Sequence, residues 1–86
     1  MTQAHILRAA LIQMSAHEEP RLNIERSHAA VRSAAKNGAQ LIVLQELHNT
    51  RYFCQQQDPT LHDLAEPIPG PSTDALGGLA RELGCV

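Results

Sequence analysis

The sequence predicts an α/β fold in which parallel strands alternate with helices. Two apolar segments lack the alternation of half-exposed strands and are typical of strands covered on both faces. The first runs from Ile6 to Met14 with its centre at Ala9–Ile12, and the second is Leu41–Leu44. A helical pattern from Pro20 to about Asn37 separates them, and a second helical pattern follows a proline-rich connector at 66–71. A strand–helix–strand unit of this kind implies parallel strands with a right-handed crossover.

The first predicted helix has recognisable ends. Pro20 suits the first helical position, where its missing N–H costs nothing. Gly38 is predicted to end the helix in a left-handed conformation. Between these ends, one face carries a stripe of residues at helical spacing: Ile24, His28, Val31 and Ala35. We expect this face to pack on the sheet.

The second predicted helix follows the connector. Ser72 is predicted as its N-cap and Gly84 as its C-terminal cap. Gly77 and Gly78 lie inside this helix and weaken it by about 1 kcal/mol each relative to Ala. We interpret them as points of close packing against a neighbouring element. Residues 85–86 have the character of the first residues of a third strand.

The predicted strands and helices do not make a complete domain. An all-parallel sheet must be covered on both faces, and two strands with two helices cannot achieve this. A chain this short buries only about 60% of the surface that its unfolded form exposes. We therefore expect residues 1–86 to be the N-terminal part of a single domain, truncated at the start of the third strand.

Composition excludes several classes of partner. The chain has seven Lys and Arg residues and nine Asp and Glu residues, which gives a net charge of −2. It contains no run of like charge that would suggest a nucleic-acid or membrane partner. No apolar stretch approaches the length of a membrane span, and the run at 9–12 is too short for a signal peptide. Cys54 and Cys85 do not form a disulfide framework, so we expect a cytoplasmic location.

Glu46 is the main candidate for chemistry. It lies two residues past Leu44, and open α/β sheets place their active sites just outside the carboxyl ends of the strands. In an amide-type hydrolase Glu46 would act as the general base. Since an ordinary glutamate has a pKa of about 4.3, such a base needs partial burial to work at neutral pH.

Tyr52 and Phe53 are the only Phe, Tyr or Trp residues in the chain, and both follow Glu46 in its loop. An ordinary small domain would place its aromatic residues in the core. We therefore predict them as substrate-pocket residues, although an equal alternative is that they fasten the loop to the sheet.

Two other classes of function stay open, and one is excluded. A zinc site could use Glu46, His48 and Cys54, with His62, but the chain has neither an HExxH motif nor paired CxxC motifs, so we expect no metal. A phosphate cradle is excluded because the first strand-to-helix turn, 15–19, has two acidic residues and no glycine. A non-catalytic interaction module remains an alternative, because exposed sheet edges recruit partners.

Three segments together resemble the carbon–nitrogen hydrolase (nitrilase) superfamily. They are LIVLQELHN at 41–49, YFCQ at 52–55 and DLAEPIPGPST at 63–73. The resemblance covers nearly the whole chain. Its QELH and YFCQ motifs are similar to those of the bacterial N-carbamoylputrescine amidase branch.

The resemblance implies an αββα sandwich, no cofactor, and a Glu-Lys-Cys triad of which only Glu46 is present. The family's Lys and nucleophilic Cys come from later strands. The resemblance therefore gives neither Cys54 nor Cys85 the role of nucleophile, and the 86-residue chain alone is expected to be inactive.

The substrate implied is a small-molecule carbamoyl amine. An enzyme of this branch hydrolyses N-carbamoylputrescine to putrescine, carbon dioxide and ammonia in polyamine biosynthesis, and the complete protein is expected to be a homo-oligomer. Another amidase of the family, such as a ureidopropionase-like enzyme, is the alternative.

Overall fold

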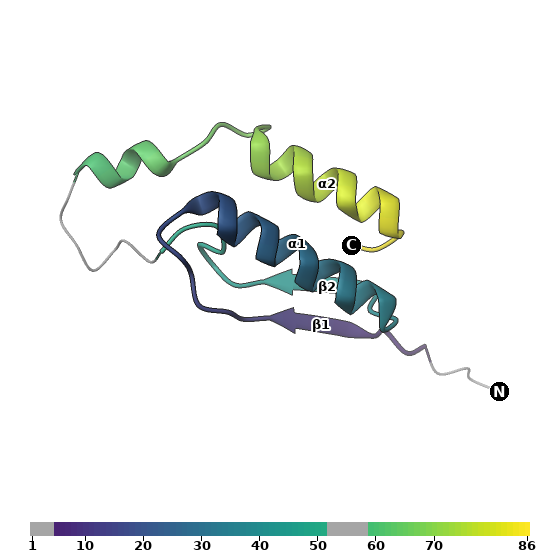
Figure 1. The fold of residues 1–86 in the computed structure, drawn as a ribbon. Coiled ribbons are helices and arrows are strands. Elements are labelled where there is room, and N and C mark those ends of the chain that lie inside the picture. Colours follow the sequence, from purple (N-terminus) through teal and green to yellow (C-terminus); the bar gives the residue numbers. More distant parts are fainter. Residues whose placement is uncertain (1–4, 52–58) are drawn as a thin grey trace.

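The computed structural model describes residues 5–51 and 59–86. Its elements follow the order β1 (Ala9–Ile12), α1 (Pro20–Lys36), β2 (Leu41–Leu44), a short 3₁₀ helix (Pro59–Leu64) and α2 (Pro71–Leu83). This order confirms the predicted α/β class and the alternation of strands and helices (Figure 1). The 3₁₀ helix was not predicted from the sequence.

The two strands form a parallel pair, as predicted. Their register runs from Ala9 opposite Leu41 to Ile12 opposite Leu44. On the other edge of β2, the Ile42 N–H donates to the Val86 carbonyl at 2.8 Å, and the Val86 N–H donates to the Gln40 carbonyl at 2.9 Å. This alternation of bonds is that of a parallel pair. Val86 therefore lies where the predicted third strand would pair with β2.

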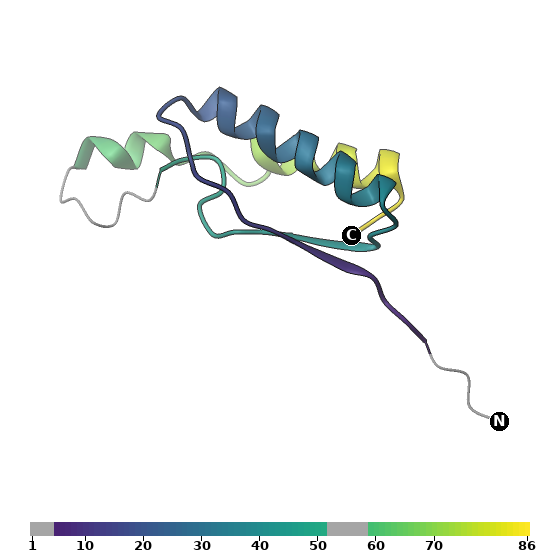
Figure 2. The same cartoon turned by 60° about the horizontal axis from the view of Figure 1, so that its bottom comes forward.

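Both helices lie on one face of the sheet (Figures 1 and 2). α1 packs on both strands, and α2 packs against α1. Between the sheet and the helices lies an apolar space of about 110 Å³ whose lining includes Val31, Ile42 and Leu44. Val31 and Leu79 are the buried apolar residues of the described chain, each 6% exposed. The core is therefore as thin as the length of the chain predicts.

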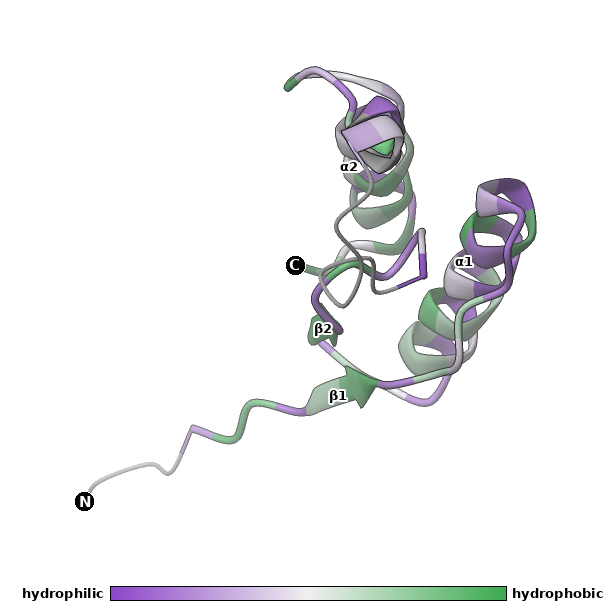
Figure 3. Cartoon of the chain, turned by 90° about the vertical axis from the view of Figure 1, so that its left-hand side faces the viewer, coloured by the Kyte–Doolittle hydropathy of each residue, from purple (hydrophilic) through white to green (hydrophobic). Residues whose placement is uncertain are grey.

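The opposite face of the sheet has no cover among the described residues (Figure 2). Leu11 is 82% exposed and its register partner Val43 is 45% exposed. Figure 3 shows apolar colour on both strands, with the two helices on the same side. The prediction that the strands are covered on both faces is thus met on one face only, because the described chain contains no second layer.

The ends of α1 agree with the sequence, but its buried face is displaced from the predicted stripe. Pro20 begins the helix, and Gly38, at φ +94°, follows its C-terminal cap. The buried positions are Asn23, Ser27 and Val31, whereas Ile24 and His28 are only half-buried. Two polar residues therefore occupy the face that the apolar stripe was expected to fill.

The N-cap of α2 is Gly70, not Ser72 as predicted. The Thr73 hydroxyl accepts a hydrogen bond from the Gly70 N–H at 2.7 Å and donates to the Gly70 carbonyl at 3.0 Å. A Cβ at Gly70 would lie 2.2 Å from the Pro67 carbonyl oxygen, so this close approach requires glycine. Ser72 falls instead in the first turn of the helix.

Predictions were also made for three other glycines in or directly after α2, and one of the three is confirmed. Gly84 ends the helix in the left-handed conformation at φ +65°, as predicted. A Cβ built on Gly77 or Gly78 meets no atom of the described chain within 4 Å. The interpretation of these two residues as points of close packing is therefore wrong for the described residues.

Within the described residues, neither α1 nor α2 is long and apolar enough to cross a membrane.

Candidate active site

Glu46 lies at the edge of the sheet where both strands end. β1 and β2 are parallel and in register, so their carboxyl ends, Ile12 and Leu44, point to the same edge. Glu46 is exposed in a turn that begins two residues after β2. Just before it, the Gln45 side-chain carbonyl accepts a hydrogen bond from the Met14 N–H at 2.6 Å. This bond ties the segment after β2 to the segment after β1.

The turn that carries Glu46 is compact. It spans 46–49, and Leu47 within it has a φ of +54°. Non-glycine residues seldom adopt the left-handed conformation, so it persists where surrounding contacts hold it. Among the described residues, side-chain hydrogen bonds anchor the turn at both of its ends.

Asn23 anchors the far end of the turn to α1. Its side chain is 0% exposed. Its Oδ1 accepts from the His17 N–H at 2.6 Å, and its Nδ2 donates to the His17 carbonyl at 2.8 Å and to the Asn49 carbonyl at 3.2 Å. A buried amide is costly unless it is hydrogen-bonded, and these three bonds satisfy most of its capacity. Asn23 therefore joins the loop after β1 to the turn after β2.

The first turn of α2 anchors the same turn from the other side. The Asn49 Nδ2 donates to the Ser72 hydroxyl at 2.9 Å. The Ser72 N–H in turn donates to the Glu66 carboxylate at 2.6 Å. A carboxylate is favourable at a helix N-terminus, where N–H groups lack partners inside the helix. Ser72 thus serves the site as an acceptor for Asn49.

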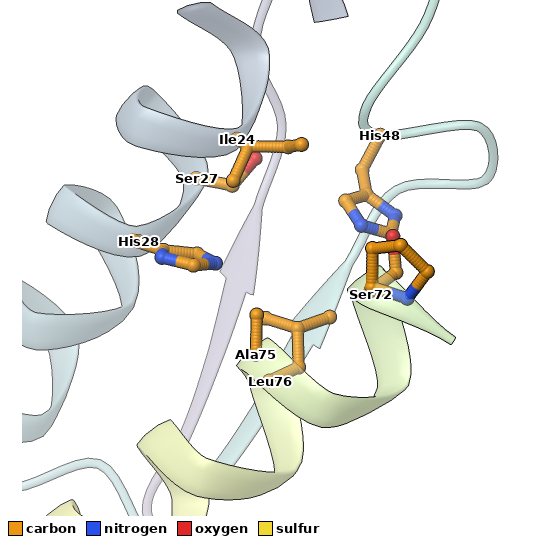
Figure 4. Close-up of a pocket in the computed structure, with 8 residues that line it drawn as sticks. Ile24, Ser27, His28, His48, Ser72, Ala75 and Leu76 are labelled. Carbon is orange, nitrogen blue, oxygen red and sulfur yellow. The ribbon is translucent and has the colours of Figure 1, made fainter. Parts of the chain in front are cut away.

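A small cavity lies beside this turn, between α1 and the start of α2 (Figure 4). Its volume of about 20 Å³ is enough for one water molecule. Figure 4 shows Ser27 and His28 on the α1 side and His48 and Ser72 on the other. The Ser27 hydroxyl is buried and has no hydrogen-bond partner among the described residues.

His48 is half-buried at this cavity. Burial lowers the pKa of its imidazole below the ordinary value of 6.5. The Glu66 carboxylate acts in the opposite direction, and His28 adds to the lowering. The imidazole therefore favours its neutral form.

The other predicted site residues lie partly beyond the described chain. Tyr52, Phe53 and Cys54 are outside the described residues. The His62 side chain is also outside the described part of the structure. Among the side chains that are described, no group of three from His, Cys, Asp or Glu could hold a metal ion. The described part of the chain therefore brings only Glu46 and His48 of the predicted candidates into one turn.

The residues that hold the turn were not predicted as site residues from the sequence: Asn23, Asn49 and Ser72. A signal for Asn23 was present, because Asn23, Ser27 and Val31 are spaced at four-residue intervals and share one face of a helix. A polar residue on the face that packs on a sheet needs hydrogen-bond partners there. The partners of Asn23 come from residues six and 26 positions away, and helical spacing does not identify them.

Comparison with known proteins identifies relatives over most of the chain. Residues 8–86 match the family described as carbon–nitrogen hydrolase. An N-carbamoylputrescine amidase of Solanum lycopersicum is 34% identical over 82 residues, which are 94% of this chain and 27% of that protein.

Two relatives carry other names. An omega-amidase of Bos taurus is 37% identical over 75 residues, 87% of this chain and 26% of that protein. A citrullinase of Francisella tularensis is 34% identical over 62 residues, 72% of this chain and 22% of that protein. The chain thus spans about a quarter of the length of the relatives it matches. No solved structure matches it.

Proposed function

Because this chain belongs to the carbon–nitrogen hydrolase (nitrilase) family, we propose that it is part of an amidase in which Glu46 is the general base. The observation that carries the proposal is the position of Glu46. Its exposed carboxylate lies in the turn directly after β2, at the edge where both parallel strands end. Open α/β sheets bind their ligands at this edge.

The proposed substrate is a carbamoyl amine, N-carbamoylputrescine. Its hydrolysis consumes water and yields putrescine, carbon dioxide and ammonia. The similarity to a protein named N-carbamoylputrescine amidase supports this substrate, at 34% identity over nearly the whole chain. The relatives named omega-amidase and citrullinase support a second candidate, another amidase of the same family, such as a ureidopropionase-like enzyme.

The proposed reaction needs a Lys and a Cys in addition to Glu46, as the family resemblance implies. A thiolate attacks the carbamoyl carbon, the bond from that carbon to the terminal NH2 breaks, and ammonia leaves to give a covalent thiocarbamate. Water then cleaves the carbon–sulfur bond, which regenerates the thiol and releases the carbamate of putrescine, and this carbamate decomposes to putrescine and carbon dioxide. The Lys stabilises the developing negative charge while Glu46 moves protons between thiol, leaving group and water. The apolar cover that a general base needs would come from the rest of the αββα domain and from the substrate. We also propose that the complete protein is a homo-oligomer.

The test is Glu46→Gln in the full-length protein. Gln keeps the size and hydrogen-bonding capacity of the side chain but cannot accept a proton. General-base catalysis contributes about 10²–10⁴-fold to the rate, so turnover of N-carbamoylputrescine should fall by about 10²-fold or more. The fold should remain intact. Steady-state ammonia release measures turnover, and circular dichroism checks the fold. Near-normal activity of Glu46→Gln would remove Glu46 from the mechanism.

His48→Gln is the matched control, because His48 lies two residues away in the same turn. The amidase proposal expects a modest effect from this variant. The alternative zinc site expects both variants to lose activity and bound zinc together. Measurement of both zinc content and turnover in the two variants distinguishes the amidase proposal from the zinc site.

A further inference from the structure

We infer that Asn23 is a positioning residue for Glu46, acting through the turn that carries it. This inference rests on the proposed function, since it gives Asn23 a role only if Glu46 is the base. Asn23 belongs to α1, and its side-chain hydrogen bonds go to His17 and Asn49, not to Glu46. Its effect is on the backbone of the turn at 46–49.

Asn23 is held rigidly in the structure. It lies in the second turn of α1, a helix of 17 residues that packs on both strands. Its side chain is 0% exposed, and all three of its hydrogen bonds go to loop atoms outside the helix. A fully buried and bonded amide on a rigid helix has a single orientation. Asn23 therefore fixes two loops relative to the helix.

Hydrogen bonds to other segments hold the turn at both ends. At the start, the Gln45 side chain accepts from the Met14 N–H. At the end, the Asn49 carbonyl accepts from Asn23, and the Asn49 side chain donates to Ser72. Glu46 lies between these anchors with an exposed side chain. Loss of the Asn23 bond to Asn49 should therefore loosen the backbone that carries Glu46.

Catalysis by a general base is sensitive to small displacements of that base. A general base must lie within hydrogen-bond reach of the proton it accepts. A misplacement of about 1 Å, from a change far from the chemistry, can reduce the rate by about 10²-fold. Binding of the substrate is less sensitive, because Glu46 contributes proton transfer rather than uniform affinity. Loss of Asn23 should therefore lower kcat much more than it raises KM.

The experiment compares variants of the full-length protein, with N-carbamoylputrescine as substrate. Asn23→Ala removes the anchor on α1, and Ser72→Ala removes the acceptor on α2 without touching the buried amide. Both should lower kcat per folded molecule, by about 10–100-fold and about 3–10-fold respectively, with KM within about threefold of the original value. Asn37→Ala is the matched control, because Asn37 is an exposed asparagine at the other end of α1. It should leave kcat unchanged.

The double variant Asn23→Ala/Glu46→Gln separates positioning from stability alone. If Asn23 acts through Glu46, adding Asn23→Ala to Glu46→Gln lowers kcat no further, because no base remains to be positioned. Full additivity of the two losses would overturn the inference. If Asn23→Ala does not fold, the Ser72→Ala/Glu46→Gln pair provides the same comparison.

The outcomes also distinguish this inference from the proposed function. If Glu46→Gln retains near-normal activity, the proposed base fails, and the inference fails with it. If Glu46→Gln abolishes turnover while Asn23→Ala and Ser72→Ala keep the original kcat per folded molecule, only the positioning role is overturned.

Discussion

At the scale of single residues, His48 makes the stability of the structure sensitive to pH. Burial lowers its pKa below 6.5 in the folded chain, so the unfolded chain binds its proton more readily. The stability contributed by neutral His48 is therefore present above about pH 6.5 and is lost as the pH falls toward the folded-state pKa. We expect an NMR titration of the His48 ring to give a pKa below 6.5. The resonance is assigned by its absence in His48→Gln.

The same His48→Gln variant checks the link to stability. Its urea midpoint should change less between pH 7 and pH 5.5 than that of the original chain, since one titrating group is gone. A His48 pKa at or above 6.5 would contradict the expectation.

At the scale of elements, α2 contains two glycines that lower its helical stability. Gly77 and Gly78 lie inside the helix, and a Cβ on either meets no atom of the described chain within 4 Å. We expect Gly77→Ala and Gly78→Ala each to stabilise α2 by about 0.4–1 kcal/mol, because alanine reduces the entropy lost on helix formation. Circular dichroism of the 86-residue chain would measure the gain in helix content.

Gly70→Ala is the matched contrast. Its Cβ would lie 2.2 Å from the Pro67 carbonyl, so the substitution should reduce helix content. A loss of helix content in Gly77→Ala would show that another element packs closely there.

At the scale of the whole molecule, the uncovered sheet face determines how the isolated chain behaves. Leu11 and Val43 form a register pair on this face, 82% and 45% exposed. Burial of an apolar side chain is worth about 1.5–3 kcal/mol, so association through this face is favourable. We expect the isolated chain to self-associate with increasing concentration in sedimentation experiments, and Leu11→Lys to weaken this association.

Ile68→Lys is the control for that experiment. Ile68 is 86% exposed, but it lies in the connector before α2 and not on the sheet. It should leave association unchanged. A monomer with a sharp, concentration-independent melting transition would contradict the expectation.

The sequence by itself determined the order of the strands and α-helices, the parallel pairing and the position of Glu46. These features follow from local signals: unbroken apolar runs for the strands, Pro20 at the start of α1, and Gly38 and Gly84 after the helix ends. Such signals act over a few residues, because helix caps and strand patterns are determined by neighbours along the chain. The wrong prediction of Ser72 as the N-cap of α2 also arises from reading local signals alone. Ser72 and Gly70 are both suitable N-caps, and only the close approach of Pro67 selects glycine.

Only the tertiary structure decided how the turn after β2 is held. The bonds of Asn23 to Asn49 and of Asn49 to Ser72 join residues 26 and 23 positions apart. Whether a polar side chain on a helix face finds a partner depends on which loop folds beside it. That is a property of the packed chain and leaves no periodic pattern in the sequence. Tertiary structure likewise decided that one sheet face is covered and the other open, because the apolar runs of both strands are compatible with a layer on either side.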